Sequence, residues 1–165
     1  MKIKENREFI PPLIIRNRHI QSIMNSLGPR KFRANKIANK LISKRIVIET
    51  KKGVRLIAEH TISNAKRSVR KIKYLVVLLH GWEGSSESAY MVTTTNTLLV
   101  NGFDVLRLNF RDHGDSHSLN KELFNSNKID EVGDAIKEFK DTNEYQNILL
   151  GGFSLGGNFA LRISS

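Results

Sequence analysis

Residues 147–156 read N-I-L-L-G-G-F-S-L-G, and this stretch decides the fold of the chain. Its first four residues, Asn147–Leu150, are typical of a short strand, and Gly152 to Gly156 match the pattern G-x-S-x-G. The apolar run Phe159–Ile163 then predicts a helix. Strand, glycine-flanked serine and helix together predict a nucleophile elbow, a tight turn that exposes a serine at the carboxyl edge of a sheet.

The residue types of this turn fit that role. Gly152 and Gly156 have no side chain to clash where strand and helix approach closely. Ser154 is therefore the candidate nucleophile, and the backbone N–H of Leu155 is a candidate oxyanion donor. The alternative is a glycine-rich turn whose serine only caps a helix.

The sequence upstream supplies the rest of an α/β pattern. Apolar runs at Tyr74–Leu79 and Phe103–Phe110 predict strands, and Ala89–Val100 and Ile129–Lys140 predict helices. The order strand, helix, strand, helix, strand, helix predicts a mostly parallel sheet with right-handed crossovers. The carboxyl ends of parallel strands share one edge, so the loop after Leu79 should lie near Ser154. The backbone N–H of Trp82 in that loop is then the second candidate oxyanion donor, whereas His80 is expected to be structural.

The first part of the chain predicts helices and a hairpin in place of alternating strands and helices. Asn17 is placed to cap a helix that ends at Gly28-Pro29, and residues 30–40 predict a second short helix or a loop. Residues 45–50 and 54–61 predict a hairpin around Gly53. We expect a basic helical leader over residues 1–43 and a partial α/β domain over residues 44–165.

Three stretches resemble the α/β-hydrolase superfamily: H-G-W-E-G-S-S from His80, N-F-R-D-H-G-D-S from Asn109, and G-F-S-L-G-G-N from Gly152. Within it, R-N-R-H-I-Q-S-I from Arg16 is similar to the N-x-H-x-Q segment of the YheT-like predicted esterases, which are related to the ABHD lipid hydrolases. The hairpin segment K-K-G-V-R-L is also similar, although that branch usually has Asp where this chain has Lys52. The resemblance implies a serine esterase acting on carboxylic, including lipid, esters through an acyl-enzyme at Ser154, with Trp82 and Leu155 as oxyanion donors.

The sequence after Ser154 lacks the other two residues of a Ser-Asp/Glu-His catalytic triad. In this fold an Asp or Glu and then a His come after the serine, but residues 155–165 contain none of the three. All histidines lie upstream, and His113 and His117 are expected to be loop residues, as are Asp112 and Asp115. We therefore expect a chain truncated after the elbow and inactive alone, with the strand before Ser154 left as an apolar edge that could self-associate. A second polypeptide supplying the missing half is the less common alternative.

Charge and composition bound the other functions. The net charge of +11 is divided unevenly: residues 1–73 hold 20 Lys or Arg and four Asp or Glu, a net of +16, and residues 74–165 hold seven and 12, a net of −5. A non-catalytic module for nucleic acid or an anionic membrane surface is therefore the alternative function. No aromatic interleaving or zinc motif supports nucleic-acid binding, and we expect none. Peripheral membrane contact and a small ester substrate are the expected partners. The chain has no cysteine, no signal peptide is evident, and no metal or other cofactor is implied, so a cytoplasmic protein is expected.

Overall fold

The computed structural model describes residues 10–64 and 74–165, without the side chains of residues 25–27. The basic connector cluster Lys66, Arg67, Arg70, Lys71 and Lys73, and the charged residues before Phe9, lie outside the described residues. No helix within the described ranges is both long and apolar enough to cross a bilayer.

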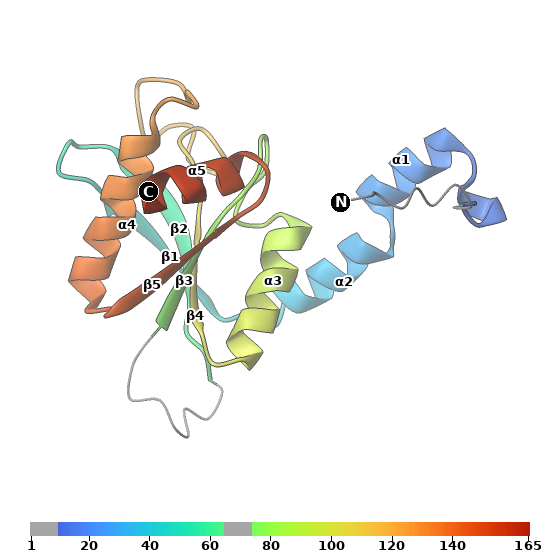
Figure 1. Ribbon diagram of the computed structural model, residues 1–165, viewed down its shortest axis with the longest axis horizontal. Helices are drawn as coiled ribbons and strands as arrows, with labels where there is room; N and C mark the ends of the chain where they lie inside the picture. Colours follow the sequence, from blue (N-terminus) through green and yellow to red (C-terminus); the bar gives the residue numbers. More distant parts are fainter. Residues whose placement is uncertain (1–9, 65–73) are drawn as a thin grey trace, which may run out of the picture.

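A five-stranded sheet in the order β1-β2-β4-β3-β5 forms the centre of the molecule (Figure 1). Strands β3, β4 and β5 are parallel, whereas β1 pairs antiparallel with β2, and β2 pairs antiparallel with β4. The predicted hairpin thus becomes the outer two strands of a mixed sheet. The strands are β1 (Ser43–Glu49), β2 (Arg55–Thr61), β3 (Tyr74–Leu79), β4 (Asp104–Leu108) and β5 (Asn147–Gly152).

Helices cover both faces of the sheet. Helices α4 (Ile129–Asn143) and α5 (Leu155–Ser164) bury the larger apolar core, in which Val77, Leu106 and Phe159 are fully shielded from solvent. Helix α3 (Ala89–Val100) covers the opposite face through Met91, which contacts the second apolar core around Val105. Since β3 is buried on both faces, its continuous apolar run is explained.

The N-terminal residues form a short 3₁₀ helix η1 (Leu13–Ile15) and two helices, α1 (Arg18–Leu27) and α2 (Pro29–Ala38). Asn17 caps α1 as predicted, because its Oδ1 accepts a hydrogen bond from the His19 N–H at 2.9 Å. Residues 30–40, for which the sequence predicts a second short helix or a loop, are mainly helical, with Pro29 at the first turn of α2. Helix α2 rests on α3, and α1 extends away from the sheet (Figure 1).

Strand β4 is shorter than the predicted Phe103–Phe110. Its end is set by the residues that follow, because the Asn109 Oδ1 accepts from the Ser86 N–H at 2.6 Å and the Phe110 N–H donates to His80 at 3.2 Å. These bonds tie the start of the next loop to the loop after β3. The segments that follow β3 and β4 are therefore hydrogen-bonded to each other at the carboxyl edge of the sheet, and β5 lies next to β3.

Candidate active site

Ser154 lies at the tight turn between β5 and α5. Its φ of 52° and ψ of −115° fall in a region that residues with a side chain rarely adopt, at a cost of about 1–3 kcal/mol. The side chain is exposed and makes no capping hydrogen bond to α5. The serine is thus held in a strained turn and is not used as a helix cap.

The two flanking glycines permit this turn. A Cβ on Gly152 would overlap the backbone of Gly156, and a Cβ on Gly156 would overlap the Leu79 carbonyl oxygen and lie 2.5 Å from that of His80. Such contacts would push α5 away from the end of β3. Glycine at both positions is therefore a steric requirement of the turn between strand and helix.

The loop after β3 lies directly against the serine. A Cβ on Gly81 would be 3.4 Å from the Ser154 Cβ and 3.6 Å from the Tyr90 hydroxyl oxygen. That hydroxyl oxygen accepts a hydrogen bond from the Gly81 N–H at 3.0 Å, and the Tyr90 ring contacts the Phe153 ring with centroids 4.7 Å apart. Tyr90 on α3 therefore connects the two loops that meet at Ser154, a role that no sequence motif indicated.

Two backbone donors at this edge have no acceptor among the described residues. One is the N–H of Trp82, the residue after Gly81, and the other is the N–H of Leu155 at the first position of α5. The Trp82 ring is 63% exposed and contacts Phe124 edge-on with centroids 5.9 Å apart. The role predicted for Trp82 uses only its backbone N–H and not its ring.

His80 is fully buried and held as a neutral imidazole. Its Nδ1–H donates to the Gly81 carbonyl at 2.7 Å, and its Nε2 accepts from the Phe110 N–H at 3.2 Å. Burial lowers the pKa of His80 to about 4, with a smaller contribution from nearby His113. Both ring nitrogens are engaged in fixing loops, so this histidine is structural.

The residues after β4 form a turn and make no hydrogen bond to Ser154 in the described structure. Asp112 has a φ of 57° and accepts from the Phe124 N–H at 2.6 Å, and Asp115 pairs with Arg45 at 2.6 Å. His113 donates from Nδ1 to the Arg111 carbonyl at 2.7 Å, whereas His117 is exposed. Arg111 itself forms a buried ion pair with Glu131 at 2.6 Å, which ties this turn to α4.

The other two histidines belong to different parts of the fold. The Nε2 of His60 on β2 lies 2.9 Å from the Tyr145 hydroxyl, which donates to Asp104 at the start of β4. Burial lowers the pKa of His60. His19 is exposed on α1. Within the described ranges, no histidine is placed as a base for Ser154, and no group of three His, Asp or Glu side chains could bind a metal.

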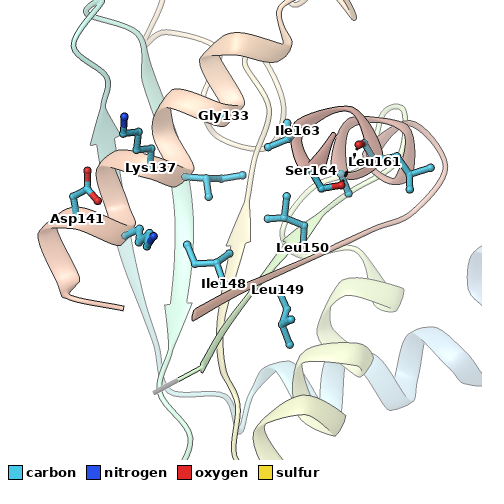
Figure 2. A pocket seen from close by; sticks show the side chains of 12 residues that line it. Gly133, Lys137, Asp141, Ile148, Leu149, Leu150, Leu161, Ile163 and Ser164 are labelled. Atoms are coloured by element: carbon cyan, nitrogen blue, oxygen red, sulfur yellow. Dashed lines mark hydrogen bonds between the residues drawn. The ribbon is translucent and has the colours of Figure 1, made fainter. Parts of the chain in front are cut away.

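Two hollows adjoin β5, α5 or α3, the elements that surround Ser154. One, of about 600 Å³, runs along β5 between α4 and α5 and is lined by Ile148, Leu150 and Ile163 (Figure 2). The other, of about 870 Å³, separates α2 from α3 and extends to Tyr90. Ser154 lines neither of them.

The model of the α/β hydrolase fold matches residues 74–165, and the chain belongs to this family. The match covers the three parallel strands β3, β4 and β5 and the helices α3, α4 and α5.

Solved structures extend this likeness to a larger share of the chain. The Pyrococcus furiosus esterase Pf2001 is 26% identical, with a TM-score of 0.62, over 78% of this chain and 47% of that one. XC6422 from Xanthomonas campestris, described as an α/β serine hydrolase without a lid, is 19% identical, with a TM-score of 0.56, over 74% and 55%. A serine hydrolase homologue from Coxiella burnetii is 17% identical, with a TM-score of 0.59, over 73% and 56%. The chain thus spans about half the length of these proteins, and no curated protein sequence matches it.

Proposed function

We propose that this chain carries the nucleophile and oxyanion donors of a serine hydrolase that cleaves carboxylic esters. The observation that carries the proposal is the strained, exposed Ser154, which lies against the Gly81 loop. The N–H groups of Trp82 and Leu155 in the adjoining segments have no acceptor among the described residues. A folded protein retains such strain mainly where function requires the geometry. The likeness to an esterase at 26% identity supports the same reaction class.

The reaction would proceed through an acyl-enzyme. The Ser154 Oγ attacks the ester carbonyl carbon while its proton passes to a general base, and the carbonyl oxygen becomes an oxyanion. The N–H groups of Trp82 and Leu155 donate hydrogen bonds to that oxyanion, and each such donor typically contributes 10² to 10³ in rate, as an order of magnitude. Collapse expels the alcohol, which takes the proton. Water then attacks the acyl group, releasing the acid and restoring the serine.

The general base and its acid would come from residues outside these 165. A serine hydroxyl without an imidazole partner is a weak nucleophile at neutral pH, so this chain alone should be nearly inactive. The position of β5 at the edge of the described sheet leaves room on its outer side for further chain. Within the family, Asn17, His19 and Gln21 favour the YheT-like branch. In the structure Asn17 caps α1, and the Gln21 side chain donates to the Ile15 carbonyl at 2.6 Å.

A fluorophosphonate probe tests the proposal. The 165-residue chain should label at background level, as should its Ser154→Ala variant, and Ser118→Ala serves as an exposed-serine control. A longer chain, read from the coding sequence past Ser165 and carrying the Asp and His, should label strongly and lose labelling only with Ser154→Ala. Strong labelling of the 165-residue chain would contradict its inactivity. Failure of the longer, folded chain to label would contradict the hydrolase assignment.

A further inference from the structure

Residues 13–40, which we name the basic arm, carry one sign of charge. They contain seven Arg or Lys and no Asp or Glu. All seven cations are exposed, and no carboxylate of the described residues forms an ion pair with them. They are Arg16, Arg18, Arg30, Lys31, Arg33, Lys36 and Lys40. The basic arm therefore presents an uncompensated positive surface.

The same arm also exposes large apolar side chains. Ile14 is 80% exposed and Phe32 74% exposed, values far from those of a packed core. On α1, Ile20, Ile23 and Met24 recur at i, i+3 and i+4, so they share one face of the helix. Single exposed apolar residues are ordinary, but a concentration of them on one segment marks an interaction surface. The six are Leu13, Ile14, Ile20, Ile23, Met24 and Phe32.

The arm is attached to the body through α2. Ala34 of α2 is buried, and α2 makes a substantial contact with α3, whereas the main contacts of α1 are with η1 and α2. Figure 1 shows α1 standing beyond α2, away from the sheet. The apolar face of α1 is thus free to meet a large flat partner without disturbing the elbow at Ser154.

We propose that the basic arm binds the surface of an anionic membrane. Its cations would contact lipid phosphates, and its apolar side chains would enter the boundary between headgroups and acyl chains, as interfacial amphipathic helices do. Nucleic acid would use the cations but leave Leu13, Ile14 and Ile23 without a partner. A second copy of the arm would bring the same seven cations against each other. Charge complementarity and exposed apolar area together favour the lipid surface.

Flotation of the 165-residue chain with vesicles tests this inference independently of any hydrolase activity. The chain should bind vesicles of equal parts phosphatidylcholine and phosphatidylserine at least about tenfold more tightly than phosphatidylcholine alone, and high salt should weaken binding. The charge variant Arg30→Gln/Lys31→Gln/Arg33→Gln and the apolar variant Leu13→Ser/Ile14→Ser/Ile23→Ser should each bind several-fold more weakly. Since the six side chains replaced in these two variants are all exposed, both variants should keep the wild-type circular dichroism spectrum and melting curve.

Two control variants, each with two substitutions, lie outside the arm. Lys51→Gln/Lys121→Gln removes exposed cations, and Val100→Ser/Leu123→Ser removes exposed apolar side chains, and neither should alter vesicle binding. The proposal is overturned if the chain does not bind the mixed vesicles, or if the controls weaken binding as much as the arm variants. Binding to duplex DNA or RNA without vesicle binding would assign the arm to nucleic acid instead. Self-association that only the apolar variant abolishes, without vesicle binding, would assign it to a second copy.

Discussion

The Tyr90 hydroxyl oxygen accepts a hydrogen bond from the Gly81 N–H at 3.0 Å. This single bond joins the start of α3 to the loop that lies against Ser154. The same hydroxyl also limits the space at Gly84, where a Cβ would overlap it. Tyr90 therefore fixes the loop that carries the Trp82 N–H.

Tyr90→Phe should reduce the free energy of unfolding by about 1 kcal/mol, because the Gly81 N–H loses its acceptor while the ring is kept. Tyr90→Leu should cost roughly 1 kcal/mol more, because it also removes the ring contact with Phe153. Urea unfolding of the 165-residue chain measures both variants. Equal stability of Tyr90→Phe and wild type would show that the hydrogen bond contributes nothing.

Gly156→Ala should destabilise the chain by about 3 kcal/mol, because its Cβ would meet the backbone carbonyls of Leu79 and His80 and backbone cannot yield as a side chain can. Gly133→Ala is the matched control, since this glycine lies inside α4 with no atom within 4 Å of a Cβ. That control should be neutral or stabilise the helix by up to about 1 kcal/mol. Denaturant midpoints compare the two, and equal effects would contradict the close approach at the elbow.

The pKa of His80, lowered to about 4 by burial, makes stability depend on pH. The unfolded chain takes up a proton at His80 near pH 6.5, whereas the folded chain does so only near pH 4. The stabilising contribution of neutral His80 is therefore complete above pH 6.5 and is lost progressively as the pH falls to 4, by roughly 3 kcal/mol in total.

Urea unfolding at pH 7.5 and 4.5 measures this loss in the wild type, in His80→Asn and in the exposed-histidine control His117→Asn. The fall in stability between the two pH values should be smaller in His80→Asn, because the amide does not titrate, and unchanged in His117→Asn. An equal pH dependence in all three proteins would show that His80 titrates normally in the folded state.

The local features of the fold could be predicted from sequence. The cap at Asn17, the strand at Tyr74–Leu79 and the serine turn at Ser154 depend on neighbours within a few residues, so their patterns are readable directly. The strand order could not be predicted, because β4 lies between β2 and β3 through pairings between distant residues. The Tyr90–Gly81 bond could not be predicted for another reason, since nothing in the sequence distinguishes this tyrosine from one that only packs.

Leu149→Lys should reduce self-association of the chain. Strand β5 pairs with β3 on one side and is an edge of the described sheet, and its Leu149 side chain is 47% exposed. Unpaired backbone groups beside apolar side chains are a template for pairing with another chain, and a lysine on such an edge opposes it.

Val100→Lys, at an exposed position of α3, adds the same charge away from the edge and is the matched control. Light scattering coupled to size exclusion should show a concentration-dependent mass for wild type and Val100→Lys and a monomer for Leu149→Lys. A wild-type chain that stays monomeric at every concentration would contradict association through this edge.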